Sequence, residues 1–586
     1  MDNPIIGIDL GTTNSVASVL EGKSPVTILI DHAKLLPSAV SLTKEGFIVG
    51  QTAKNILILE PEKTVMSIKR KIGQDITLRV GDKKMRPEEI TAIILKKIRD
   101  AAIEHLQLDA SQQLRVVITV PAYFTEEQRA ATKQAAELAE LQVERIINEP
   151  TAAALAYGMS SLDEAVYAIY DFGGGTFDIS IVESNDGLVE VLATKGDNQL
   201  GGDDLDHLLM EYIWEKFKSI NKLGNIKWSP KEEARLWRIA EQTKIKLSSE
   251  MEVDVQESFF LKHKDLNLHL DLTVKRTDFE NLIKKHIEQT VTLLKTAIKD
   301  AQLRSSEIDG VILVGGSSRI PLIKTTIEEQ LNIDTDLIHS PDEAVSHGAT
   351  IQGAIIDKKD IDTILIDITP HSLGVAVADD SFYHTLSNQI MQSGQPDTDI
   401  DKNLGLGVLI KKNTPIPVRK TKMFSSSVSF QEIYEIKIAQ GENDRFGDNK
   451  EIGVSNLKVK DPVEHGKIEV TFDLDINGLL KLSAIEVNTN EVVSAEFQSS
   501  KGIKGQKSKL VKTNNLTVVS QKTENTLLSR AKNLLEQDAL SSEDKADLKT
   551  LIQQYETQNQ AQEHDAMKAT ESELLDLLYF LENNDN

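Results

Sequence analysis

The chain has 586 residues, more than one hydrophobic core normally holds, so two to four domains are expected. Its composition, 40% hydrophobic and 27% charged, is typical of a globular protein, and a formal net charge of −25 argues against general nucleic-acid binding. The absence of cysteine excludes disulfides, thiolate catalysis and cysteine-ligated metals, and no apolar run approaches membrane-spanning length.

The start of the chain, Met1-Asp-Asn-Pro, enters a strand pattern at once and leaves no room for a signal peptide, so we expect a cytoplasmic protein. That first pattern, residues 5–14, predicts a strand and a turn that leads into a second strand, and it recurs at residues 166–181. Each copy is an apolar run that bends at an Asp-x-Gly turn and continues with threonine.

Such turns suit polyphosphate, because glycines let successive backbone N–H groups approach anionic oxygens closely. The carboxylates of Asp9 and Asp171 cannot face phosphate directly, so a Mg²⁺ ion, often through its waters, is expected between them. One copy alone would be an ordinary hairpin turn. Two copies predict two related lobes with a nucleotide between them. Neither is a P-loop or a dinucleotide fingerprint, since no Gly-Lys-Ser/Thr follows and a strand rather than a helix comes next.

Further along the chain, helical spacing predicts a helix over 88–105, and an apolar run over 114–124 predicts a buried strand. Thr125 and Gln128 have capping-box spacing and open a predicted helix that continues to Ala139. A long helix is predicted over 232–247. A strand at 311–314 is expected to break at two glycines before a helix that starts near Pro321.

Residues 374–497 alternate between apolar and polar, which predicts strands, and Asn477-Gly478 predicts a hairpin turn. A polar stretch over about 379–403 interrupts this pattern. Three helices are predicted near the C-terminus, each with one apolar face: Leu527, Leu528, Ala531, Leu534 and Leu535; Leu548, Leu551, Ile552 and Tyr555; Leu574, Leu575, Leu578 and Leu581.

Residues 8–15, 169–180 and 311–321 resemble the signatures of the DnaK-type, seventy-kilodalton heat-shock chaperones, and the likeness runs from residue 5 to about residue 500. The resemblance implies a multidomain α/β plus β fold. Residues 1–358 would be an actin-like, two-lobed ATPase domain (a duplicated ribonuclease-H-like fold) and 359–370 an interdomain linker. Residues 371–500 would be a β-sandwich that binds peptide, and 501–586 a connector with a shortened helical lid.

The resemblance also implies a nucleotide site that uses ATP/ADP, Mg²⁺ and K⁺. Lys69 and Glu149 would orient the attacking water, Asp9 and Asp171 would hold hydrated Mg²⁺, and Asp178 would accept a proton or bind K⁺. Thr12, Thr13 and Thr176 would contact phosphate. The other expected nucleotide contacts are Gly11, Asn14, Gly173, Gly174, Gly175, Gly201, Gly202, Glu241, Lys244, Ser248, Gly315, Gly316, Ser317, Arg319 and Asp342. Ile245 stands where relatives place an arginine that stacks on adenine, although some bacterial members share the apolar choice.

Communication between the domains would run through Pro121 and Arg129 and through the apolar run Ile364-Leu-Ile-Asp367, by the same resemblance. Without it, Pro121 would be a strand terminator and the run could be the first strand of the next domain. The expected peptide site comprises Val375, Val377, Ala378, Phe424, Ser427, Tyr434 and Ile436. Small residues at Ala378 and Ser427, and Tyr434 in place of a small apolar residue, predict a shallower pocket and a narrower client range.

The expected partners are an unfolded or client polypeptide, a J-domain co-chaperone and a nucleotide exchange factor, with no nucleic acid or membrane and a monomeric chain. A small-molecule kinase and an actin-like filament protein are rivals on the same ATPase fold, and the pattern over 374–497 argues against both. Within the family, residues 201–209 also resemble HscA, the specialised iron–sulfur-assembly chaperone. A dedicated chaperone for one client, such as an iron–sulfur scaffold protein, is therefore the open alternative to general folding.

Overall fold

The structure is a computed structural model. It describes residues 3–109, 111–158, 164–185, 187–263, 266–337, 340–359, 364–378, 404–426, 429–459, 461–487, 491–496 and 542–561, with isolated positions between 531 and 570. The chain divides into two units, Met1–Ser508 and Lys509–Asn586. The first unit contains an N-terminal α/β region (residues 3–359), a strand β19 (Ile364–Ile368) and a β region (residues 373–496).

Two large sheets of the α/β region share one strand order and one set of directions. In each, the first three strands are antiparallel neighbours, and two later strands add in parallel beside the first. The first sheet is ordered β11 (Leu141–Asn148), β10 (Leu114–Val120), β1 (Ile5–Asp9), β2 (Asn14–Glu21) and β3 (Ser24–Thr27), with β4 (Leu36–Pro37) beside β2. The second is ordered β18 (Thr335–Leu337), β17 (Gly310–Val314), β12 (Glu164–Phe172), β13 (Phe177–Asn185) and β14 (Leu188–Asp197). The two predicted phosphate turns thus occupy equivalent places in a repeated topology.

Helices α4 (Glu149–Tyr157) and α9 (Ala344–Ile356) join the two sheets, and small residues allow them to cross closely. A Cβ atom on Gly348 would lie 1.8 Å from the Ala152 carbonyl oxygen, so only glycine fits there. Other helices and small sheets cover or extend these two sheets: α1 (Gln51–Leu59), α2 (Pro87–Leu106), α3 (Glu126–Leu138), α5 (Gly202–Asn221), α6 (Pro230–Leu247), α7 (Arg276–Asp300), α8 (Pro321–Leu331), β5 (Val40–Leu42), β6 (Phe47–Val49), β7 (Thr64–Val65), β8 (Leu78–Val80), β9 (Lys83–Met85), β15 (Glu252–His263) and β16 (Leu266–Lys275).

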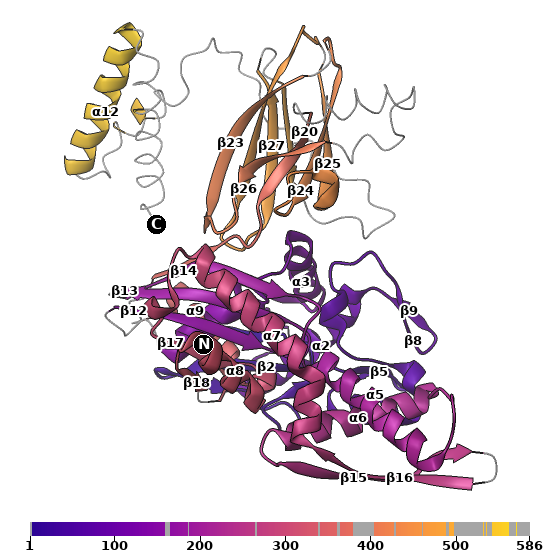
Figure 1. Ribbon diagram of the computed structural model, residues 1–586. Helices are drawn as coiled ribbons and strands as arrows, with labels where there is room; N and C mark the ends of the chain where they lie inside the picture. Colours follow the sequence, from indigo (N-terminus) through magenta and orange to yellow (C-terminus); the bar gives the residue numbers. More distant parts are fainter. Residues whose placement is uncertain are drawn as a thin grey trace. The chain divides into compact units, whose positions relative to one another are not determined.

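The β region consists of two four-stranded sheets, drawn in orange in Figure 1, whose inward side chains share one hydrophobic core. Alternating residues of β26 such as Val470 and Phe472 are buried there, as the sequence predicts. One sheet is ordered β21 (Gly405–Ile410), β20 (Leu373–Val377), β24 (Ile433–Gln440) and β25 (Lys450–Lys458). The other is ordered β23 (Val418–Ser425), β26 (Lys467–Leu474), β27 (Leu480–Glu486) and β28 (Glu491–Glu496).

Strand β19 connects the two regions through backbone pairing. It lies parallel to β14 of the α/β region, and it pairs in antiparallel fashion with β22 (Pro415–Ile416) of the β region. The second large sheet therefore continues through the predicted linker as a seven-stranded sheet. The apolar run is therefore a strand, and this strand joins the sheet that precedes it in the chain.

Within the second unit, helix α12 (Ser542–Ala561) has the predicted apolar face, with Leu548, Ile552 and Tyr555 buried. The predicted helices over 88–105, 125–139 and 232–247 are confirmed within a few residues as α2, α3 and α6. Gly478 has a φ of 74° in the turn between β26 and β27, as a hairpin glycine requires. The polar stretch 379–403 and most residues of the first and third C-terminal helices lie outside the described residues.

Candidate nucleotide site

The two glycine turns meet face to face, and no side chain larger than hydrogen fits at their contact. A Cβ atom on Gly174 would lie 1.9 Å from Thr13 Oγ1, and one on Gly175 would lie 2.4 Å from the methyl group of Thr12. Both predicted phosphate contacts of the first turn therefore lie against the second turn. The repeated topology thus brings together two loops that are about 160 residues apart in sequence.

Two further loops close on the same turn. Gly202 and Asp203, at the start of α5, donate backbone N–H bonds to the carbonyl oxygens of Gly173 (3.0 Å) and Gly174 (2.7 Å). Ser317 Oγ donates to the Gly173 carbonyl oxygen at 2.9 Å. These contacts place the predicted residues Gly201, Gly202 and Gly315–Ser317 around one centre, where the start of a long helix and glycine-rich backbone favour an anion.

Carboxylates crowd beneath these turns. Asp171, Asp178 and Glu149 are nearly excluded from solvent, Asp9 is half-buried beside them, and Lys69 forms a buried ion pair with Glu149. Burial, together with repulsion from Glu149, raises the pKa of Asp9 and of Asp178 to about 7, and it raises the pKa of Asp171 as well. The positive charge of Lys69 opposes each of these increases. The cluster therefore has a surplus of negative charge that a bound cation would relieve.

The chemistry of this donor set fits hydrated Mg²⁺, which prefers oxygen ligands and retains several waters. Across the described ranges, no group of three or more His, Asp or Glu side chains is arranged to ligate an ion directly. Asp9 and Asp171 would accordingly hold the ion together with water and phosphate oxygens rather than enclose it. Asp178 accepts the Tyr123 backbone N–H at 2.9 Å, which fixes its carboxylate beside Asp171 on the paired strand.

The predicted nucleoside contacts lie on α6 and on the turn after β17. Lys244 Nζ donates to the Gly202 carbonyl oxygen (3.0 Å) and to Asp206 (2.8 Å), and Glu241 pairs with Lys54 of α1 at 2.6 Å. Arg319 pairs with Asp342 at 2.7 Å, so both predicted residues lie together. The Ser248 hydroxyl donates back to the Lys244 carbonyl oxygen, and Ile245 is 62% exposed, available for contact with a flat ring.

Two further residues predicted to contact phosphate, Gly11 and Thr176, belong to the tight parts of their turns. A Cβ atom on Gly11 would lie 1.9 Å from the Asn14 carbonyl oxygen, so these two residues form a tight turn that admits no side chain at Gly11. The Thr176 carbonyl oxygen accepts the Gly173 N–H at 3.1 Å and closes the second turn.

A comparison with protein families agrees with this geometry. The Hsp70 protein model matches the chain over residues 5–79, 74–393 and 399–583, which is nearly its whole length. The chain belongs to the Hsp70 family. Members of this family are ATP-dependent chaperones that bind ATP or ADP with Mg²⁺ and act on client polypeptides.

In this Hsp70 protein, the predicted signalling residues form a buried polar chain between the nucleotide site and β19. Arg129 on α3 donates to the Asn148 side chain, and Asn148 Nδ2 donates to Asp367 Oδ1 at 2.7 Å. Thr151 adds a bond to the other Asp367 oxygen at 3.4 Å. Glu149, the partner of Lys69, directly follows Asn148. Pro121 ends β10, and the side chains of Ile364, Leu365 and Ile366 range from exposed to half-buried along β19.

Several contacts join the α/β region to the β region around this chain. Asp300 of α7 pairs with Lys412 (2.7 Å) as well as with Lys195 of its own region (3.0 Å). Asn477 Oδ1, in the β26–β27 turn, accepts the Ile146 backbone N–H at 2.9 Å. Lys450 pairs with Glu127 at 2.5 Å. The described β region is therefore seated on the α/β region by hydrogen bonds and ion pairs as well as by β19.

Sequence reasoning did not single out Asn148, Asp203, Lys412 or His371. Asn148 had a usable signal, because asparagine directly before Glu-Pro is typical of a helix N-cap. Its side chain makes no cap bond, however, and instead joins Arg129 to Asp367. Asp203 accepts bonds from Ser67 (2.5 Å) and Thr13 (3.3 Å), and an acid directly after two glycines could have been recognised as part of the turn.

The predicted peptide residues gather in the β region. Val375, Tyr434 and Ile436 are buried in its core, and Val377 and Phe424 pack against the same core. The Tyr434 hydroxyl lies so close to Gly466 that a Cβ atom there would be 2.2 Å from it. Ala378 is exposed at the end of β20, and Ser427 lies outside the described residues. Tyr434 thus fills space between the two sheets of the β region.

Proposed function

We propose that this protein is an ATP-driven chaperone in which residues 1–358 form a two-lobed, actin-like ATPase domain and residues 371–500 form a peptide-binding β-sandwich. Residues 359–370 would be the linker and 501–586 a connector and short helical lid. The observation that carries the proposal is the convergence of the two glycine–threonine turns with Gly201, Gly202 and Ser317. The membership of nearly the whole chain in the Hsp70 family supports it.

Hydrolysis in this proposal depends on positioning and charge neutralisation. Lys69 and Glu149, paired in the closed site, would hold and orient the water that attacks the terminal phosphate. Thr12, Thr13 and Thr176 would donate to phosphate oxygens, and Asp178 would accept a proton or bind K⁺. Bound Mg²⁺, held by Asp9 and Asp171 through water, would supply charge neutralisation at the phosphates.

Coupling to the client would use β19 and the chain from Arg129 to Asp367. We propose that ATP favours the seated arrangement, in which client exchanges rapidly, and that hydrolysis releases β19 and closes the peptide site. A J-domain co-chaperone and a nucleotide exchange factor would set the pace, and we propose a monomer that acts in the cytoplasm. In the described residues, no helix combines the length and the apolar character needed to cross a membrane.

The test is single-turnover ATP hydrolysis measured with and without a J-domain protein and a panel of unfolded peptides. Stimulation by both additions supports a coupled chaperone, and the best peptide begins to define the client. If no general peptide stimulates ATP hydrolysis but one protein does, such as an iron–sulfur scaffold, the result would favour a chaperone dedicated to one client. Phosphorylation of a small molecule would instead support the kinase rival.

Tyr434 offers a direct prediction about client range. Replacing Tyr434 with valine would remove a ring that is almost fully buried between the sheets, and should open space for one apolar client side chain. We expect a leucine-centred peptide to bind at least about tenfold more tightly to Tyr434→Val than to the parent, since one buried leucine contributes roughly 1.5–3 kcal/mol.

The control is Tyr434→Phe, which keeps the ring and removes only the hydroxyl, and it should bind like the parent. Fluorescence anisotropy of a labelled peptide measures both. Tight binding of the leucine peptide to the parent chain itself would contradict the reshaped pocket.

A further inference from the structure

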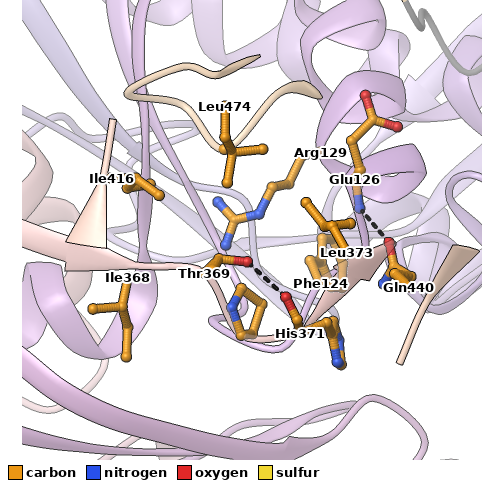
Figure 2. Close-up of a pocket in the computed structure, with 12 residues that line it drawn as sticks. Phe124, Glu126, Arg129, Ile368, Thr369, His371, Leu373, Ile416, Gln440 and Leu474 are labelled. Carbon is orange, nitrogen blue, oxygen red and sulfur yellow. Dashed lines mark hydrogen bonds between the residues drawn. The ribbon is translucent and has the colours of Figure 1, made fainter. Parts of the chain in front are cut away.

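The joint between the two regions contains a small pocket that is partly open to solvent (Figure 2). Its walls come from both sides, with Glu126 and Arg129 on α3, His371 just before β20, and Gln440 on β24. Glu126 and His371 are ionisable groups that the proposed hydrolysis does not use. Residues from across the joint bury Glu126 and half-bury His371.

Glu126 is sealed in by the β region. Its backbone N–H donates to Gln440 Oε1 at 3.4 Å, and its carboxylate accepts the Leu480 backbone N–H. The other carboxylate oxygen, Oε1, is buried and makes no hydrogen bond with any described residue. A buried carboxylate with an unsatisfied oxygen is costly when charged and much less so when protonated.

The surroundings of Glu126 favour the protonated form. Burial, helped by the nearby charges of Glu127 and Asp475, raises the pKa of Glu126 from 4.5 to about 8. The Leu480 N–H and the charge of Lys450 act in the opposite direction, as does the start of helix α3, but loss of water is the largest effect. Gln440, Leu480, Asp475 and Lys450 all belong to the β region, so separation of the regions would return Glu126 to water.

His371 is half-buried against the α/β region. Its ring packs edge-on against the Tyr123 ring with 4.3 Å between centroids, and Nε2 lies 3.4 Å from the Tyr123 carbonyl oxygen. Burial lowers the pKa of His371 from 6.5 to about 4. The Tyr123 carbonyl and Glu442 favour the charged ring, whereas Arg129 and Lys195 oppose it. Glu442 itself accepts the Ser372 N–H and hydroxyl, which fixes the turn that carries His371.

We propose that seating of the β region on the α/β region is coupled to proton binding at Glu126 and His371. The joint would then be a pH-sensitive switch that closes in mildly acidic solution and opens in mildly alkaline solution. The closed joint favours a protonated Glu126 and a neutral His371, because at each group the loss of water outweighs the neighbouring charges and hydrogen bonds that favour the ionised form.

The direction follows from the two groups taken separately. Above pH 4.5, closing of the joint is accompanied by proton binding at Glu126. The equilibrium constant for closing therefore falls as the pH rises from 4.5 to about 8. Closing expels a proton from His371 below pH 6.5, so the constant falls as the pH drops from 6.5 to about 4. The two effects cancel between 4.5 and 6.5. From pH 6.5 to 8 Glu126 dominates, and the closing constant should fall with a limiting slope of roughly tenfold for each pH unit.

The experiment measures closing as the distance between two fluorophores on the full chain. Because the chain has no cysteine, Glu137→Cys on α3 and Asn456→Cys on β25, both exposed positions, provide unique labelling sites. Energy transfer is recorded from pH 5.5 to 8.5 with saturating Mg-ATP. We expect the closing constant to fall about eightfold between pH 6.5 and 8 in the parent chain, because each end of this range lies at a pKa and the limiting slope of roughly tenfold per pH unit is not reached there.

Three variants assign the effect. Glu126→Gln should abolish the fall above pH 6.5. Glu127→Gln, the matched control one residue away, removes the ion pair to Lys450 and should weaken closing while the slope persists. His371→Gln should let the closing constant keep rising below pH 6.5, because no histidine proton opposes Glu126. The proposal would be overturned if the closing constant of Glu126→Gln still fell with pH above 6.5, or if that of the parent chain did not fall.

If the joint of Glu126→Gln fails to close, an infrared measurement on the parent protein can still detect protonation of a carboxylate on closing. The difference spectrum between ATP-bound and ADP-bound parent protein at pH 7.5 should contain the C=O stretch of a newly protonated carboxylic acid. The same band should be retained in Glu127→Gln and lost in Glu126→Gln, and its absence from the parent would contradict proton uptake. Neither readout needs hydrolysis or client, so failure here leaves the proposed chaperone activity open, and the reverse also holds.

Discussion

Replacing Lys69 with alanine should reduce single-turnover ATP hydrolysis by about 100- to 1,000-fold, the usual cost of removing one group that stabilises charge in a transition state. Lys69 is 3% exposed, pairs with Glu149, and favours the charged forms of Asp9, Asp171 and Asp178. Without it, Glu149 would be left as an uncompensated buried charge beside three further carboxylates. The cluster would then bind protons in place of orienting water.

The matched control is Lys71→Ala, which removes an exposed lysine from the same short turn, Ile68–Lys71. It should hydrolyse ATP at nearly the parent rate. Hydrolysis is followed with labelled ATP at enzyme excess, and nucleotide affinity is measured separately with a fluorescent analogue. A Lys69→Ala chain that binds ATP and hydrolyses it within about threefold of the parent would remove Lys69 from the proposed mechanism.

The parts of this site that sequence predicts well are set by local backbone chemistry. Asp9-Leu-Gly11 and Asp171-Phe-Gly-Gly-Gly175 each specify a strand, a turn and an approach to anions within a few residues. The antiparallel part of each sheet then follows from short connections between consecutive strands, whereas β10 and β17 join β1 and β12 from far along the chain. Asn477-Gly478 predicted its turn for the same local reason.

Contacts between distant segments were harder to predict, since no local pattern encodes them. Nothing around His371 distinguishes a histidine packed on Tyr123 from one in water, and Glu126 looks like an ordinary first-turn acid of α3. Their burial depends on how β24 and β27 meet α3, which is a property of the assembled joint. The resemblance to the DnaK-type chaperones predicted roles for Arg129 and Asp367 but not for Asn148, the residue that links them by hydrogen bonds.

The second large effect is expected at Asp367, where the polar chain from the nucleotide site ends. Asp367 is 5% exposed, and its carboxylate accepts hydrogen bonds from Asn148 (2.7 Å) and Thr151 (3.4 Å). Its backbone lies opposite Ile416 where β19 pairs with β22. Asp367→Asn would remove a negative charge that interacts with Arg129. It would also replace one acceptor oxygen by an NH₂ group, which cannot accept a hydrogen bond from Asn148 or Thr151.

We expect Asp367→Asn to destabilise the closed joint by about 2 kcal/mol, or roughly 30-fold in its equilibrium constant, which is the cost of leaving buried polar partners unsatisfied. ATP hydrolysis should persist but lose its response to client peptide and J-domain protein. The control is Asp357→Asn, which breaks a partly exposed pair with Arg115 (2.8 Å) near the end of α9 and should leave the response intact. If Asp367→Asn is stimulated as strongly as the parent, the signal reaches the β region by another path, and the contacts of Asp300 with Lys412 and of Ile146 with Asn477 are the next to test.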